Sequence, residues 1–165
     1  MTGTNEDFDK VMRHHRKAWR VERIAWFVIA LTLAAALFGA FGGGVLSEAQ
    51  VGSRQTVTIE YDRLLRSSAP SLMRFHVHPS LRRDGAVRLR IDRSIVSRME
   101  IESIVPQPLS QASGADYTEF VFDVAPGESP ATIDLRYRPS TFGRMRGEVS
   151  IAGEHALVID QFVYP

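Results

Sequence analysis

An uncharged stretch of 24 residues, from Ile24 to Ser47, constrains this chain of 165 residues more than any other feature. A helix rises about 1.5 Å per residue, so roughly 20 apolar residues cross the hydrocarbon core of a bilayer. A cleaved signal peptide has a shorter apolar region, about 7–15 residues, and a helix of a soluble protein is apolar on one face only. The stretch therefore predicts a retained transmembrane helix over residues 24–46. A cleaved signal peptide and a buried helix of a soluble protein are the alternatives.

Basic residues gather on the N-terminal side of this stretch. Six Lys or Arg fall within residues 10–23, whereas the other side offers only Arg54 before the first predicted strand. The excess of positive charge on cytoplasmic flanks predicts residues 1–23 in the cytoplasm and the C-terminal part in the periplasm or outside the cell, with the protein in a bacterial inner membrane. The side chains expected at the lipid headgroups are Arg13, Arg16, Lys17, Trp19, Arg20, Arg23 and Trp26.

Small residues recur every four positions in the predicted membrane helix. Such spacing lets a second helix approach closely enough for good packing in lipid. It predicts a helix–helix contact, either with a second copy or with a multi-span membrane protein, through Ala35, Ala36, Gly39, Ala40, Gly43 and Gly44.

After a linker over residues 47–54, the hydrophobic period changes to two. Val57, Ile59 and Tyr61 alternate with Thr58 and Glu60, which is typical of a half-buried strand. Similar runs, separated by turn residues, cover 72–78, 86–92, 98–105, 117–124, 131–138, 147–153 and 155–164. They predict an immunoglobulin- or fibronectin III-like antiparallel β-sandwich of 7–8 strands over residues 55–165, with a small barrel as the alternative. The terminal "IDQFVYP" is expected to close the sandwich, although a free tail could add to a partner's sheet.

Composition excludes several classes of function. The chain has no cysteine, and hence no disulfide framework, no thiolate nucleophile and no zinc–thiolate site. Residues 46–165 carry 14 arginines and 15 carboxylates, which argues against a nucleic-acid partner, since such proteins are usually strongly basic.

Arginines concentrate in "LRRDGAVRLRIDRSIVSR". They are candidates for binding phosphate, lipid headgroups or an acidic envelope polymer, because guanidinium groups pair well with such anions. They could equally form a solvated strand face that resists aggregation. The residues are Arg82, Arg83, Arg88, Arg90, Arg93 and Arg98.

The segment "FHVHP" places His76 and His78 on one face of a strand. Two imidazoles can bind copper, zinc or nickel, and His155 is a conceivable third ligand. The alternative is a pair of surface histidines, and no cofactor is predicted.

Paired carboxylates also occur, at Glu60 with Asp62 and at Glu100 with Glu102. General acid–base sites hold such pairs in a cleft, whereas strand faces usually carry solvated charge. The chain lacks a G-x-S-x-G motif, and its glycine-rich segment lacks the lysine of a phosphate loop. We therefore expect a protein that is not an enzyme.

The phrases "IEYDRLLRSSAPSLMRF", "IVPQP", "GRMRGEVSI" and "QFVYP" resemble small bacterial single-pass membrane proteins with an exported all-β domain. The resemblance covers roughly residues 57–165 and implies no catalytic residues. It implies an accessory or interaction role. The sequence thus predicts an accessory subunit of a membrane protein complex, with binding of an anionic envelope ligand or, less favoured, of a periplasmic metal as alternatives.

Overall fold

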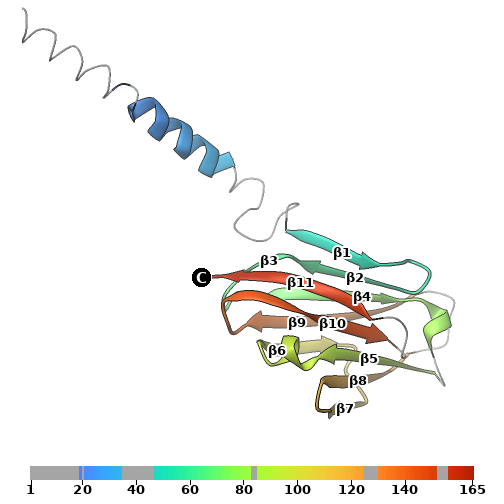
Figure 1. Cartoon of the computed structure of the whole chain (residues 1–165). Helices are drawn as coiled ribbons and strands as arrows, with labels where there is room; N and C mark the ends of the chain where they lie inside the picture. Colours follow the sequence, from blue (N-terminus) through green and yellow to red (C-terminus); the bar gives the residue numbers. More distant parts are fainter. Residues whose placement is uncertain (1–18, 20, 35–46, 83–84, 125–129, 152–155) are drawn as a thin grey trace, which may run out of the picture. The chain divides into compact units, whose positions relative to one another are not determined.

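A computed structural model describes residues 19, 21–34, 47–82, 85–124, 130–151 and 156–165 of the chain (Figure 1). Contacts between residues divide the chain into two units, residues 1–38 and residues 39–165, which are taken separately below.

The first unit contains a helix that is described over residues 21–34. The predicted transmembrane helix over residues 24–46 is wrong, because no helix in the described part of the chain is long and apolar enough to cross a membrane.

Three of the residues predicted at the lipid interface are described. Trp19, Arg23 and Trp26 are exposed, and the Arg23 guanidinium lies 4.3 Å from the centre of the Trp19 ring. The others lie outside the described residues, namely Arg13, Arg16, Lys17 and Arg20. The same holds for all six small residues of the predicted helix contact: Ala35, Ala36, Gly39, Ala40, Gly43 and Gly44.

The second unit consists of two packed sheets (Figure 1). In spatial order, the five-stranded sheet contains β1 (Glu48–Gly52), β2 (Val57–Asp62), β4 (Ser71–Val77), β9 (Ala131–Pro139) and β6 (Met99–Val105). The six-stranded sheet contains β3 (Leu64–Arg66), β11 (Leu157–Tyr164), β10 (Gly143–Ile151), β5 (Ala86–Asp92), β8 (Tyr117–Asp123) and β7 (Ser110–Ser113). A 3-10 turn, η1 (Pro79–Leu81), and a short helix, α2 (Arg93–Val96), flank β5.

The predicted all-β architecture is confirmed, but the immunoglobulin-type assignment with 7–8 strands is wrong. The described residues form eleven strands, and the chain crosses from β5 to β6 in the other sheet before it returns to β7 and β8. The additional strands are β1, β3 and β7, which have five, three and four residues and lie at ends of the sheets. Such short edge strands pair on one side only and give no clear hydrophobic alternation.

The core lies between the sheets and is formed by alternate side chains of the strands. Met73, Phe75 and Val77 of β4 are fully buried, as the period of two predicted. The six-stranded sheet contributes Leu89, Ile91 and other inward residues to the same cluster. Strand β6 contains a register shift between Ile101 and Ser103.

A glycine permits the close packing of α2 on β10. A Cβ atom added to Gly147 would lie 2.7 Å from Cγ1 and 2.8 Å from Cδ1 of Ile95, and 2.9 Å from Oγ of Ser94. Real Cβ atoms do not approach other atoms so closely, and Ile95 is fully buried. Only glycine therefore fits here without a shift of α2.

One buried polar side chain ties the two sheets together. Gln161 of β11 is 1% exposed, and its Nε2 donates hydrogen bonds to the Asp62 carbonyl at 2.7 Å and to the Tyr137 hydroxyl at 2.8 Å. Asp62 and Tyr137 belong to the five-stranded sheet. Burial raises the pKa of Tyr137 to about 12, against the smaller opposing effect of its hydrogen bond to Gln161. The phenol is thus held neutral in the core.

Replacement of Gly147 should destabilise the domain. We expect Gly147→Ala to lower the free energy of unfolding by about 1–3 kcal/mol, because the methyl group forces Ile95 out of place. Gly114→Ala is the control, since its Cβ would meet the nearest atom, the Tyr117 carbonyl oxygen, at 3.4 Å. Urea unfolding of the two full-length variants measures the effect. Equal stability of both variants would show that α2 adjusts freely.

Tyr137 should make the domain sensitive to alkali. A folded-state pKa raised to about 12 means that the neutral phenol stabilises the fold fully below about pH 10, and that this contribution is lost between about pH 10 and 12. The full effect corresponds to about 2–3 kcal/mol. The only lysines are Lys10 and Lys17, so tyrosines dominate the titration of the domain in this range.

Tyr137→Phe should therefore lose less unfolding free energy than the wild type between pH 8 and pH 11, by about 1 kcal/mol. Tyr117→Phe, at an exposed position, should behave as the wild type. An unchanged alkaline loss in Tyr137→Phe would contradict this assignment.

Candidate functional site

Of the six arginines predicted to bind an anion, the structure brings Arg88 and Arg90 together. Arg88 and Arg90 lie on the outer face of β5, where both pair with the Glu119 carboxylate of β8, at 3.7 and 2.6 Å. The hydrogen bond to Glu119 raises the pKa of Arg90, and its guanidinium also lies 4.8 Å from the centre of the Tyr117 ring. The Glu119 carboxylate thus binds both Arg88 and Arg90.

The remaining arginines of that segment lie beyond the ends of β5. Arg82 follows η1, and Arg83 is outside the described residues. Arg93 begins α2 at the other end of the strand, where its Nη1 lies 3.5 Å from the Ala115 carbonyl. Arg98 follows α2, and its Nη1 donates to the Arg144 carbonyl of β10 at 2.9 Å. A single anion site formed by all six arginines stays a prediction.

The two predicted metal-binding histidines line one cavity of about 300 Å³ on the five-stranded sheet. The His76 Nε2 lies 3.5 Å from the Glu60 carboxylate, and its Nδ1 lies 3.4 Å from the Thr132 hydroxyl. The His78 Nδ1 accepts from the Ser80 amide at 3.3 Å and so caps η1. His155 is outside the described residues. No group of three His, Cys, Asp or Glu that could hold a metal ion occurs in the described part of the chain.

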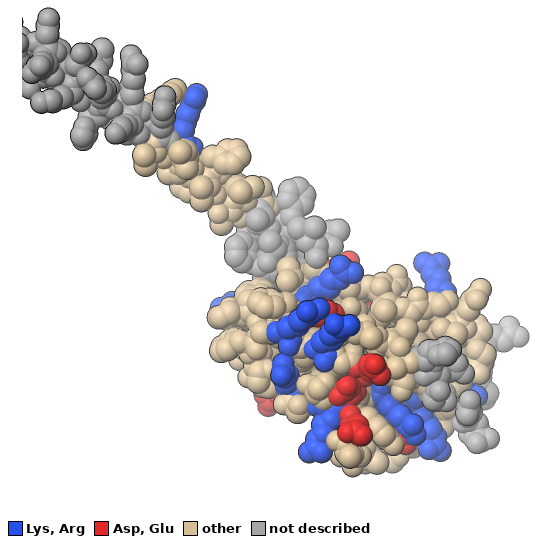
Figure 2. Space-filling view, in the orientation of Figure 1, with Lys and Arg blue, Asp and Glu red and all other residues tan. Residues whose placement is uncertain are grey.

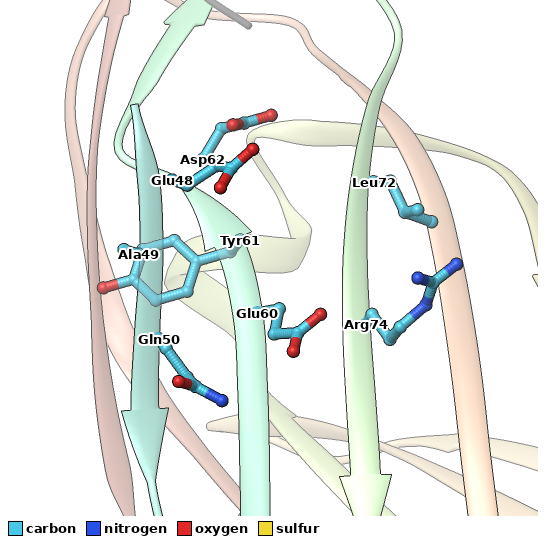
Figure 3. Close-up of a pocket in the computed structure, with 8 residues that line it drawn as sticks. All are labelled: Glu48, Ala49, Gln50, Glu60, Tyr61, Asp62, Leu72 and Arg74. Atoms are coloured by element: carbon cyan, nitrogen blue, oxygen red, sulfur yellow. The ribbon is translucent and has the colours of Figure 1, made fainter. Parts of the chain in front are cut away.

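A second groove, of about 570 Å³, lies beside this cavity and shares Gln50 and Glu60 with it (Figure 3). Carboxylates dominate its charge. Glu48 of β1 lies directly opposite Asp62 of β2, and the two side chains are close together in Figure 3. Like charges at opposing positions destabilise a sheet slightly. The groove therefore presents a local excess of negative charge.

The one arginine that lines this groove is held by a carboxylate outside it. Arg74 donates to both oxygens of Asp134 in β9, at 2.7 and 3.0 Å. This hydrogen-bonded pair keeps the pKa of Asp134 below its usual range and raises that of Arg74. Of the other predicted carboxylates, Glu102 pairs with Arg138 and lies on the same sheet. Arg74 with Asp134 and Arg138 with Glu102 thus form two ion pairs between neighbouring strands of the five-stranded sheet.

The outer face of the six-stranded sheet carries a different arrangement near the C-terminus. Pairing of β11 with β3 and β10 sets Phe162 between Leu64 and Arg144, and Tyr164 beside Arg66. Phe142 precedes the first residue of β10, and Arg146 lies opposite Asp160. We define the aromatic–arginine surface as Leu64, Phe142, Phe162 and Tyr164 together with Arg66, Arg98, Arg144 and Arg146.

Large apolar side chains in this surface are open to solvent. Phe142 is 65% exposed and Phe162 is 51% exposed, whereas their neighbours Met145 and Val163 are buried. Alternation along β11 explains the contrast, because Gln161 and Val163 point into the core and Phe162 points away from it. Exposed aromatic rings beside guanidinium groups are the composition found at centres of protein interfaces.

Positive charge exceeds negative charge around these rings. Arg144 pairs with Asp160 at 2.8 Å, and this hydrogen bond lowers the pKa of the carboxyl and raises that of the guanidinium. Among the described residues, no ion pair within 4.0 Å involves Arg66, Arg98 or Arg146. Figure 2 shows basic side chains, all of them arginines in this domain, gathered over the region of β10 and β11, with acidic side chains beside them.

Sequence analysis missed this surface because its members come from four separate segments. Residues 64–66, 98, 142–146 and 160–164 meet only after β3 pairs with β11 and α2 packs on β10. The available signal was the period of two in "IDQFVYP", which places Phe162 and Tyr164 on one face and Val163 on the other.

Comparisons with known proteins give no family. No family model matches the chain, and no curated protein matches it. Among solved structures, the crystal structure of the PmoD soluble domain from Methylocystis sp. ATCC 49242 (Rockwell) is similar, with 18% identity over 70% of this chain and 96% of that chain and a TM-score of 0.37. At this TM-score the likeness carries no argument about function.

Proposed function

We propose that this protein is a non-enzymatic interaction protein, an accessory subunit whose β-sandwich binds a partner protein through the aromatic–arginine surface. The observation that carries the proposal is the exposure of Phe162, at 51%, on a strand whose neighbours carry Arg144, Arg146 and Arg66. Monomeric proteins rarely leave contiguous apolar patches in water unless a partner covers them. The location of the domain in the periplasm stays a prediction.

The rigidity of the surface supports the same role. Phe162 lies two residues before the end of β11, which pairs with β10 over seven residues and with β3 over three. Arg98 and Ser94 bond the carbonyls of Arg144 and Arg146 on the side of β10 that β5 leaves open. Side chains held on a paired strand lose little conformational entropy when a partner binds.

The alternative of an anion-binding edge over residues 82–98 has less support. Glu119 already neutralises part of the charge of Arg88 and Arg90, and the other described arginines of this segment lie beyond the ends of β5. An anion would have to displace these ion pairs before it could bind there.

Site-specific photo-crosslinking of the full chain in its native cells tests the proposal. We expect a photo-reactive phenylalanine analogue in place of Phe162 to yield one dominant protein adduct, and the yield to fall by about tenfold when Phe142→Ala removes the neighbouring ring. The same analogue in place of Leu109, which is 68% exposed on the opposite edge of the sheet, is the matched control and should give no such adduct.

The proposal is contradicted if positions 162 and 109 give the same adducts, or if neither gives any. Circular dichroism of each variant checks that the domain is folded, which we expect because both positions are exposed.

A further inference from the structure

We infer that the partner segment that covers the aromatic–arginine surface is acidic, with carboxylates that pair with the arginines and an apolar side chain that packs against Phe162. This inference rests on the proposed function and specifies the chemistry of the partner.

The aromatic–arginine surface carries more positive than negative charge. Arg66, Arg98, Arg144 and Arg146 face two carboxylates, Asp160 and, at the far end of β10, Glu148. Asp160 is already bound by Arg144. The surface therefore keeps two more guanidinium groups than carboxylates at neutral pH. A neutral or basic partner would bury these guanidinium groups without an opposite charge, which is costly.

The strand register places arginines beside the aromatic rings. The register sets Arg144 beside Phe162 and Arg66 beside Tyr164, so cations flank the rings along β10 and β3. Guanidinium groups bind carboxylates with two parallel hydrogen bonds, which adds geometric specificity to charge attraction. Phe162 has Arg144 on one side and Leu64 on the other, so a segment that combines carboxylates with an apolar residue would match this neighbourhood of arginines and apolar side chains.

The shape of the surface favours a protein over a lipid headgroup layer. Phe162 and Leu64 stand on paired strands within a sheet. Insertion into a membrane interface buries apolar side chains about 5–10 Å deep and normally uses a projecting loop or an amphipathic helix. A sheet face offers a broad area for side-chain contacts, which suits a protein surface.

The opposite sheet makes self-association a defined alternative. The groove beside β1 and β2 is lined by Glu48, Glu60 and Asp62, which would also attract the arginines of a second copy. The experiment therefore has to separate an acidic segment of another protein from this groove.

The test uses the full chain with the photo-reactive analogue at position 162, and maps the adduct by mass spectrometry. The expected adduct joins position 162 to a segment of another protein that contains at least two Asp or Glu residues. Arg66→Gln combined with Arg146→Gln should lower the yield by about tenfold, and 0.5 M salt should lower it similarly, because exposed charge attraction is screened. Arg88→Gln, on the same sheet but paired with Glu119, is the control and should leave the yield within about twofold.

A charge swap makes the result specific. Arg146→Glu should abolish the adduct, and replacement of the mapped partner carboxylate by arginine should restore it. The inference is overturned, while the proposed function stands, if the dominant adduct forms as before in the Arg66→Gln, Arg146→Gln variant or maps to a segment without carboxylates. An adduct only with phospholipid, or only with the Glu48–Asp62 groove of a second copy, also overturns it. Absence of any protein adduct at position 162 removes the proposed function as well.

Discussion

The hydrogen bonds of one buried glutamine fix the part of the molecule on which its proposed function depends. Gln161 reaches across the core from β11 to the Asp62 carbonyl and the Tyr137 hydroxyl of the other sheet. A buried amide N–H is costly unless it is bonded, and a shift of β11 would take Nε2 away from both of its acceptors, so these contacts favour a single register. A slip by one residue would bury Phe162 and expose Val163. The hydrogen bonds of Gln161 in the core thereby determine which aromatic rings face the solvent.

The two outer faces of the sandwich differ in how their charges are used. On the five-stranded sheet, carboxylates and cations are arranged in pairs, such as Arg74 with Asp134. On the six-stranded sheet, Arg88 and Arg90 share the Glu119 carboxylate, whereas near the C-terminus, where Phe162 is exposed, only Arg144 among the described arginines of the surface has an ion pair. Ion pairs on a surface add little to stability. Because the arginines of this face are paired unevenly, one region keeps an excess of positive charge. Excess charge beside exposed apolar area is a property of binding surfaces more than of stable folds.

Much of the fold follows from the sequence, because burial on one side of a strand leaves a period of two. All eight predicted runs are strands, and the inward positions at Met73, Phe75 and Val77 were predicted correctly. The edge strands β1, β3 and β7 were missed, since Ser110–Ser113 is exposed at every position and gives no pattern. The membrane span was predicted from length and hydropathy alone, whereas no helix in the described part of the chain is long and apolar enough to cross a membrane. The aromatic–arginine surface could not be predicted, because the contact of Arg98 with the Arg144 carbonyl depends on tertiary packing.

The most direct test of a covered aromatic–arginine surface is hydroxyl-radical footprinting of the full chain, in its native cells and after purification. The account predicts that Phe142 and Phe162 are oxidised several-fold more slowly in cells than in the purified protein. Leu109, near the opposite edge of the same sheet, and Val105, on an edge strand of the other sheet, should be oxidised equally in both. Equal oxidation of Phe162 in both samples would show that nothing covers this surface, and would contradict the account.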